Sequence, residues 1–362
     1  MNLFLPKMNC FNTYSLFIKT MKEMNTFSTN KQSVLITGAA GFLGTYLAQV
    51  CVDAGYQIYG IDHKLPKNLE LWTNFVQSST SQVDFKAFLH NVELAVCFHL
   101  AGSALVAYSI QEPFQDFNKL LPGTAKLLEY IVRNQPQCHF ILFSSAAVYG
   151  NPKVLPISET ELPAPISPYG VHKQLAESLL QSYSAIYGIT CSILRIFSAY
   201  GVGLRKQLFW DILSKYYEQA PQEQQSITLF GTGNESRDFI HGFDIARAAI
   251  LVNQNPQPKQ VQIINIANGQ EVTIKDAAFN LFKSFPEEVK IHFNNQVRPG
   301  DPSRWVADIS KLTAMNYKPT IKLSNGLGEY ALWYRNQRYQ EFVSVPQKLV
   351  QHAAPVELSS RK

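Results

Sequence analysis

Three residues near the middle of the chain have the types and spacing needed for proton transfer. Tyr169 and Lys173 form a Y-x-x-x-K pattern at the start of a predicted helix, so both side chains project from one face, one turn apart. A tyrosine has a pKa of roughly 10, and an adjacent ammonium group is expected to lower that pKa. Ser145 ends the preceding predicted strand, where its hydroxyl could bind the substrate oxygen that Tyr169 deprotonates. We therefore expect Ser145, Tyr169 and Lys173 to be catalytic.

A glycine-rich turn near the start of the chain has the spacing of a phosphate-binding loop. An apolar run at 34–36 predicts a buried strand, Gly38, Gly41 and Gly44 follow it, and apolar residues recur at helical intervals from Phe42. Glycines at such places permit a tight turn, let the backbone approach a pyrophosphate and let the helix pack closely on the strand. The unit predicts a dinucleotide site, and an ordinary strand-turn-helix unit is the alternative.

An acidic residue ends the second predicted strand. Residues 57–61 form this strand and Asp62 follows it, roughly 20 residues after the loop, where a carboxylate can accept hydrogen bonds from adenosine ribose hydroxyls. The negative charge disfavours the 2′-phosphate of NADP, so we expect NAD. His63 and Lys64 lie beside Asp62 and keep NADP open.

Strands and helices must alternate to position these residues. Between the predicted strands 94–100, 140–143 and 189–196 lie the predicted helices 113–134 and 169–187, a rhythm typical of parallel βαβ units with right-handed crossovers. We expect an α/β fold with a doubly wound parallel (Rossmann) sheet and a smaller C-terminal α/β substrate-binding lobe. His99, inside a strand, is expected to be a packed residue rather than a catalyst.

The expected domain boundaries follow from this rhythm. Residues 32–196 would form the dinucleotide-binding domain and 197–345 the substrate-binding lobe, with about 238–267 returning to the large sheet. The polar stretch 63–82 is expected to be irregular, and the final helix is expected at 323–339. Residues 346–362 would form a flexible tail. Residues 1–31 would form a disordered extension, or an over-long start with Met8, Met21 or Met24 as the true initiator.

Composition narrows the class of protein. The chain has 362 residues, of which 46% are hydrophobic, and a net charge of +5 spread along its length, which suits an anionic small molecule and does not indicate nucleic-acid binding. No apolar run reaches the length of a membrane span, so we expect a cytoplasmic protein without membrane contact. The odd, scattered cysteines are expected to be reduced core residues, with no metal-ligand spacing: Cys10, Cys51, Cys97, Cys138 and Cys191.

Six short motifs together resemble those of a known family. TGAAGFLG, HLAG, SSAAVYG, YGVHK, RDFIHGFDIARA and RPGD are similar to motifs of the extended short-chain dehydrogenases/reductases, in the NAD-dependent epimerase/dehydratase group typified by UDP-glucose 4-epimerase. The resemblance covers about residues 33–340. It implies bound NAD, a nucleotide-sugar substrate and a homodimer formed through the helices at 113–134 and 169–187.

The resemblance also implies roles for individual residues. Those implied to contact the cofactor are the pyrophosphate loop, the ribose-binding acid and the residues beside the nicotinamide: Gly38, Gly41, Phe42, Leu43, Gly44, Asp62, Ala101, Ser144, Tyr169 and Lys173. Those implied to contact the substrate bind the sugar hydroxyl, the diphosphate or the nucleoside: Ser145, Ser198, Arg237, Arg298 and Asp301.

The chain departs from the family pattern at several positions. Ser198 replaces a usual Asn at the diphosphate, Ser79 a usual Asp near the adenine, and Leu120 a usual Asn before Gly-Thr. Dehydratases of the family carry Asp-Glu directly after the catalytic Ser, whereas this chain has Ala146 and Ala147. Without a side-chain proton donor there, elimination of water is hard to support.

These residues favour an NAD-dependent epimerase that acts on a nucleotide-diphosphate sugar through transient oxidation to a keto-sugar and return of the hydride. An NAD(P)H-dependent reductase of a 4-keto nucleotide sugar would use the same residues and is the alternative. A non-catalytic dinucleotide sensor is a third hypothesis, which the intact Ser145, Tyr169 and Lys173 argue against. The sugar and the nucleotide base stay open.

Overall fold

The computed structural model describes residues 32–219, 226–258, 260–296, 300 and 302–350, with only the backbone given for 219 and 340–350. The predicted extension 1–31, Arg298, Asp301 and the end of the predicted tail lie outside the described residues.

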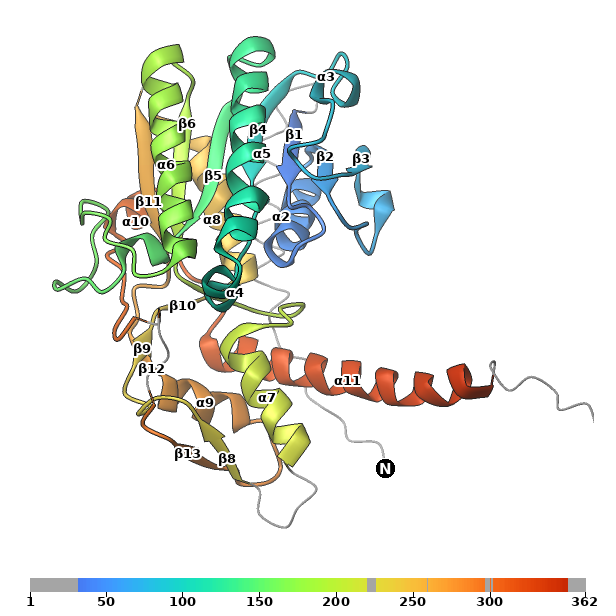
Figure 1. Cartoon of the computed structure of the whole chain (residues 1–362), viewed down its shortest axis with the longest axis vertical. Coiled ribbons are helices and arrows are strands. Elements are labelled where there is room, and N and C mark those ends of the chain that lie inside the picture. The colour runs from blue at the N-terminus through green and yellow to red at the C-terminus, as the bar shows by residue number, and fades with distance from the viewer. Residues whose placement is uncertain (1–31, 220–225, 259, 297–299, 301, 351–362) are drawn as a thin grey trace, which may run out of the picture.

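A seven-stranded sheet forms the centre of the upper lobe in Figure 1. Every neighbouring pair of its strands is parallel. The order reverses between β1 and β4, as in doubly wound folds, and this confirms the predicted fold class. Across the sheet the strands are β11 (Val261–Ile266), β6 (Cys191–Ile196), β5 (His139–Ser145), β4 (Leu94–His99), β1 (Ser33–Thr37), β2 (Gln57–Asp62) and β3 (Asn74–Gln77).

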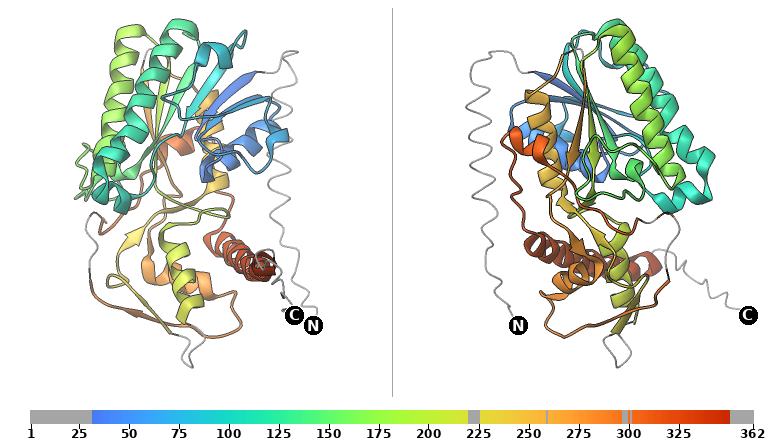
Figure 2. Two further views of the ribbon diagram at one scale, coloured as in Figure 1. Left: turned by 45° about the vertical axis from the view of Figure 1, so that its right-hand side comes forward. Right: turned by 90° about the vertical axis from the view of Figure 1, so that its left-hand side faces the viewer.

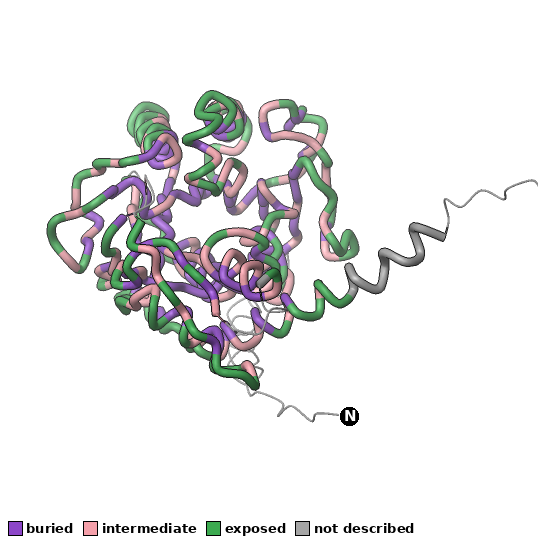
Figure 3. The backbone as a smooth tube through the Cα atoms, turned by 60° about the horizontal axis from the view of Figure 1, so that its bottom comes forward, coloured by how far each residue is buried: buried purple, intermediate pink, exposed green. Residues whose placement is uncertain are grey.

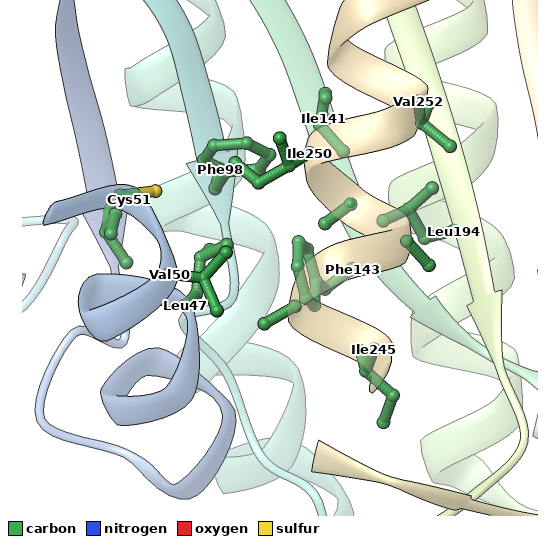
Figure 4. Packing of buried hydrophobic residues seen from close by; sticks show 14 of the residues in the cluster. Leu47, Val50, Cys51, Phe98, Ile141, Phe143, Leu194, Ile245, Ile250 and Val252 are labelled. Atoms are coloured by element: carbon green, nitrogen blue, oxygen red, sulfur yellow. The ribbon is translucent and has the colours of Figure 1, made fainter. Parts of the chain in front are cut away.

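Helices cover both faces of this sheet. Because side chains alternate along a strand, Leu35 packs under one layer and Ile36 under the other. One layer contains α2 (Phe42–Asp53), α8 (Gly242–Gln254) and the short α10 (Ser310–Ala314), and Figure 4 shows α2 and α8 packed on the strands. The opposite layer contains α3 (Phe85–Phe88), α5 (Pro113–Asn134) and α6 (Pro168–Tyr187).

The smaller lobe has its own hydrophobic core below the sheet (Figure 2). Its parallel pair β8 (Ser226–Leu229) and β13 (Lys290–Phe293) packs with α7 (Gln207–Gln219), α9 (Ile274–Phe282) and the start of α11 (Leu323–Val350). Helix α11 runs past residue 339, where we predicted its end, and projects from the body (Figures 1 and 3). Residues 346–350 of the predicted tail are therefore helical.

Two short strand pairs join the lobes. Strand β7 (Ser198–Tyr200) pairs with β10 (Phe239–His241), and β9 (Ser236–Arg237) pairs with β12 (Val272–Thr273). The chain then runs through α8 and β11 back to the large sheet.

The prediction of an irregular stretch at 63–82 is wrong. This stretch contains the 3₁₀ turn η1 (Leu69–Leu71) and the edge strand β3, which pairs with β2. As an edge strand, β3 has exposed polar residues at both ends and lacks the apolar run of a central strand. Helix α4 (Val106–Gln111) and the 3₁₀ turn η2 (Ala146–Tyr149) also escaped prediction because each is too short to show a period.

Cys51, Cys97, Cys138 and Cys191 are free and buried, as expected of reduced core residues, whereas Cys10 lies outside the described residues. Within the described ranges, no helix combines the length and the apolar character needed to cross a bilayer.

Candidate active site

A cavity of about 1710 Å³ opens at the carboxyl ends of the sheet strands, between the two lobes. This is the place where doubly wound folds bind ligands, at the reversal of strand order. Every predicted site residue that the structure describes lines it: Gly38, Gly41, Phe42, Leu43, Gly44, Asp62, Ala101, Ser144, Ser145, Tyr169, Lys173, Ser198 and Arg237.

The glycine turn is a close-packed backbone cradle between β1 and α2. Gly38 has a φ of 70°, and a Cβ there would lie 2.9 Å from Ala101 N. A Cβ on Gly44 would lie 2.7 Å from Ala39 O and would also clash with Gly38 O. The N-cap of α2 is Gly41, which has no side chain and therefore makes no capping hydrogen bond to the first-turn N–H groups of the helix. Such N–H groups are suited to bind an anion.

Asp62 ends β2 with its carboxylate at the cavity wall. Its Oδ2 accepts a hydrogen bond from Ala40 N at 3.0 Å, which ties the acid to the glycine turn, and its Oδ1 accepts one from Lys64 N at 3.0 Å. His63 Nδ1 lies 2.9 Å from Oδ1. The acid is therefore held in place before any ligand binds.

His99 is a packed residue, as predicted. Thr124 Oγ1 donates to Leu120 O, so it accepts the 2.8 Å hydrogen bond from His99 Nε2, and His99 Nδ1 in turn accepts from Thr37 Oγ1 at 2.7 Å. Burial lowers the pKa of His99 to about 3, with the nearby Lys173 charge contributing. This neutral ring fixes Thr37, which accepts a hydrogen bond from Ala101 N behind the cavity.

Helix α6 brings Tyr169 and Lys173 to the same wall as Ser145. Ser167 caps the helix by accepting from Gly170 N at 3.2 Å, and a proline occupies the first helical position. Lys173 Nζ lies 5.9 Å from the centroid of the Tyr169 ring. The structure thus brings together the three residues that we predicted to be catalytic.

The pKa of Tyr169 differs from the sequence-based expectation. Burial raises this pKa to about 12, and the charge of Asp116 adds to the rise, whereas a hydrogen bond from Ser145 opposes it. Burial also lowers the pKa of Lys173 to about 8, and Lys173 Nζ donates to Phe143 O at 2.8 Å. The expected lowering of the Tyr169 pKa is therefore wrong for the protein without ligands, because burial of the phenol raises this pKa.

The smaller lobe supplies the opposite wall. Arg237 donates to Ser236 O at 2.8 Å and lies 5.7 Å from the centroid of the Trp305 ring, and half-buried Ser198 lies at the lobe junction. Four further cations line this cavity and are not among the predicted site residues: Lys119, Arg205, Lys206 and Lys215. The adjacent Arg205 and Lys206 just before α7 were a visible signal, since a basic pair ahead of a helix suits a phosphorylated ligand.

Comparison with known proteins decides the family. The profile of the "NAD dependent epimerase/dehydratase family" matches residues 34–267, which is more than half of the chain. The chain belongs to this family. The predicted resemblance is thereby confirmed.

Relatives and solved structures that carry epimerase names are similar over most of the chain. A putative UDP-glucose 4-epimerase of Methanocaldococcus jannaschii is 27% identical, covering 84% of this chain and 98% of its own length. The uncharacterised UDP-glucose epimerase YtcB of Bacillus subtilis is 30% identical, covering 81% of this chain and 95% of its own length. The structure of UDP-glucuronic acid 4-epimerase from Bacillus cereus, in complex with UDP-glucuronic acid and NAD, superposes with a TM-score of 0.75 at 30% identity, covering 84% and 100%.

The cavity of this epimerase-family chain fits the NAD that the family name implies. The cradle around Gly38 and Gly44 leaves no space for a Cβ, and the N-terminus of α2 has no side-chain cap, which suits an anionic group such as a pyrophosphate. The carboxylate of Asp62 lies one hydrogen bond from that cradle. These features belong to the strand-turn-helix unit that predicted the cofactor, and NAD is the cofactor of the family.

The departures from the family pattern lie in different surroundings. Ser79 and Ser198 line the cavity, whereas Leu120 is buried in the core between α5 and the sheet. Ala146 is buried and Ala147 faces the cavity, so neither position after Ser145 presents a side chain that can donate a proton. Within the described residues there is no cluster of three or more His, Cys, Asp or Glu side chains placed to hold a metal ion.

Proposed function

We propose that this chain is an NAD-dependent epimerase of nucleotide-diphosphate sugars. The observation that carries the proposal is the meeting of Ser145, Tyr169 and Lys173 in the same cavity as the glycine cradle and Asp62. The names of its relatives support the reaction type, since those cited above are UDP-sugar epimerases or named as such.

The roles of the catalytic residues follow from their positions. Tyr169 would take the proton of the sugar hydroxyl and later return it, and Ser145 would hold the same oxygen by a hydrogen bond. Lys173 would favour the phenolate by its positive charge when the cavity is filled. The glycine cradle and Asp62 would hold NAD, which would supply reversible hydride transfer at the sugar carbon, so that the sugar changes configuration and no cofactor is consumed.

The remaining site residues would bind and orient. Gly38, Gly41 and Gly44 would cradle the pyrophosphate with the Phe42 and Leu43 N–H groups. Asp62 would accept hydrogen bonds from the adenosine ribose, and Ala101 and Ser144 would line the nicotinamide side. Arg237 and Ser198 would contact the substrate diphosphate, because a guanidinium group pairs well with phosphate. Arg298 and Asp301 remain predicted substrate contacts outside the described residues.

We further propose that residues 32–196 hold the cofactor and 197–345 the substrate, with 238–267 as part of the large sheet. A cytoplasmic location stays a prediction that rests on the scattered, unpaired cysteines.

A homodimer is part of this proposal. Helices α5 and α6 lie side by side on one face of the sheet (Figure 1) and expose apolar side chains on their outer sides. Phe114 and Phe117 on α5 are exposed, as are Val171 and Leu175 on α6, and Phe114 is 71% exposed. Apolar side chains gathered on neighbouring helices are typical of a protein–protein interface. A second copy of this chain would bury them in a four-helix interface.

Replacement of Tyr169 tests the proposed mechanism. Tyr169→Phe keeps the ring and removes the hydroxyl, so we expect kcat for interconversion of a UDP-sugar to fall by about 10²–10⁴-fold, the usual contribution of a positioned acid or base. The measurement is chromatography of UDP-glucose, UDP-glucuronic acid and UDP-N-acetylglucosamine after incubation without added NADH. Tyr187→Phe, on the same helix with an exposed ring, is the matched control and should retain full activity.

Two outcomes would contradict the proposal. Lasting loss of NADH absorbance with a keto-sugar, without interconversion of any nucleotide sugar, would favour a reductase. Unaltered turnover by the Tyr169→Phe protein would refute the assigned role of the phenol, and binding of NAD without any turnover would favour a sensor.

A further inference from the structure

Glu177 is a buried carboxylate that is not one of the proposed catalytic or binding residues. It lies on α6 one turn after Lys173 and is 2% exposed. Lys173 Nζ donates to Phe143 O at 2.8 Å, and Ser144 Oγ donates to Glu177 Oε1 at 2.5 Å. Lys173 and Glu177, one turn apart on α6, therefore bind the adjacent residues Phe143 and Ser144 of β5. The residue after Ser144 is Ser145.

A guanidinium group from the neighbouring strand neutralises this carboxylate. Arg195 on β6 donates from Nε to both oxygens of Glu177 at 3.2 Å and from Nη2 to Oε2 at 2.8 Å. Arg195 also lies 4.7 Å from the centroid of the Tyr149 ring and is 3% exposed. The paired charges make the carboxylate stable in the interior and fix its direction, so the oxygen that Ser144 reaches cannot turn away.

We propose that Glu177 is a positioning residue, which acts through Ser144 to fix the end of β5 against α6 and so sets the separation of Ser145 from Tyr169. The inference rests on the proposed function, because Ser145 and Tyr169 are the reacting pair there. Hydrogen bonds and ion pairs are directional, so this link fixes atomic positions more closely than apolar packing does. Such precision matters because a displacement of about 1 Å at a reacting centre can lower the rate about 100-fold.

A second buried ion pair offers a comparison within the same chain. Asp244 and Arg247 on α8 are joined at 3.0 Å, and Asp244 accepts hydrogen bonds from Thr320 N and Ile321 N at 3.0 Å. Neither Asp244 nor Arg247 lines the cavity. Loss of this pair should affect stability alone, whereas loss of the pair at Glu177 should also affect catalysis.

The charge of Glu177 should affect the pH dependence of activity, which apolar packing alone would not change. The groups that act on Lys173 are Asp116 of α5, His99 of β4, and Tyr169 and Glu177 of its own helix. Asp116 and Glu177 raise the pKa of Lys173 against the burial that lowers it. Removal of the Glu177 charge should therefore lower the pKa of Lys173. On raising the pH, the variant should then lose activity earlier than the wild type.

The test is Glu177→Gln in the full chain with bound NAD. We expect kcat to fall by roughly 10- to 100-fold, KM for the nucleotide sugar to change less than about threefold, and the alkaline limb of kcat to move to lower pH. Ser144→Ala should also lower kcat, and the double variant should be no slower than Glu177→Gln, because residues in one network are not additive.

Asp244→Asn is the matched control. It should lower the melting temperature while kcat per folded molecule and the pH profile stay as in the wild type. Three results would overturn the inference: an unchanged kcat and pH profile in Glu177→Gln, an equal loss of kcat in Asp244→Asn, or independent, multiplying effects of the Ser144 and Glu177 changes.

Failure of the proposed function can be distinguished from failure of this inference. If the wild type interconverts no nucleotide sugar, the proposed function fails first. Crystal structures of the wild type and the Glu177→Gln protein then test whether Glu177 positions Ser145. A longer Ser145 Oγ to Tyr169 hydroxyl separation in the variant supports the inference, and an equal separation overturns it.

Discussion

Three buried histidines make the stability of the fold depend on pH. Burial lowers the pKa of His99 to about 3 and the pKa values of His139 and His241 to about 4, against an ordinary value of 6.5. The folded state therefore favours the neutral rings. Their contribution to stability is complete above pH 6.5 and is lost as pH falls, because the unfolded chain takes up protons that the folded chain resists.

For one of these residues, we predict that His99→Gln reduces the acid sensitivity of folding. Between pH 7 and pH 5 the free energy of unfolding should fall by about 2 kcal/mol less in His99→Gln than in the wild type. Urea unfolding at the two pH values measures this difference. Exposed His90→Gln is the control and should keep the wild-type difference. An unaltered difference in His99→Gln would mean that other groups carry the acid response.

Single residues also show what the sequence could and could not predict. The Y-x-x-x-K spacing places Tyr169 and Lys173 on one face of a helix, and the structure brings both of them to the cavity that Ser145 lines. The direction of the Tyr169 pKa shift was not predictable, since it depends on how far the phenol is desolvated and on Asp116 of another helix. Glu177 had one signal in the sequence, a carboxylate one turn after Lys173, but its partner Arg195 became visible only with β6 in place.

At the scale of elements, the unit β1–turn–α2 depends on its glycines. In Gly44→Ala the new Cβ would meet the backbone oxygens of Gly38 and Ala39, and neither oxygen can move aside cheaply. We expect NAD to bind at least about tenfold more weakly, since 1.4 kcal/mol of strain is enough. Calorimetric titration with NAD checks this.

Gly328→Ala is the matched control for that glycine prediction. Gly328 lies within α11, and a Cβ there would meet no atom within 4 Å. We expect this change to leave NAD binding unaltered and to raise stability by about 0.5–1 kcal/mol, because alanine favours the helix. NAD affinity that is equal in the two variants would show that the cradle tolerates a side chain.

The long and buried helices and strands were predictable from the sequence, whereas a short, exposed strand was not. Central strands such as β4 and β5 have unbroken apolar runs and long helices such as α6 have clear caps, so their positions followed from the sequence. Strand β3 has four residues and half of them are exposed, and only its pairing with β2 makes it a strand.

At the scale of the whole molecule, the apolar faces of α5 and α6 lead to a prediction about assembly. Phe114→Glu combined with Leu175→Glu places two charges on this surface, and we expect a dimeric wild type to become monomeric. Light scattering during size-exclusion chromatography at micromolar concentration measures the mass. Phe279→Glu changes an exposed residue of the other lobe and should leave the dimer intact. A wild type with the mass of one chain would reject the homodimer.

The route of the chain between the lobes has a consequence for protein engineering. After β6 the chain enters the small lobe, returns through α8 and β11, leaves again through β12 and α9, and comes back at α10. A gene fragment that stops at Ile196 would thus encode a sheet lacking its outermost strand, with β6 left as a bare edge ready to pair with other molecules. Neither half of this protein can be excised as a self-contained module, and a chimera with a relative must exchange the interleaved segments together.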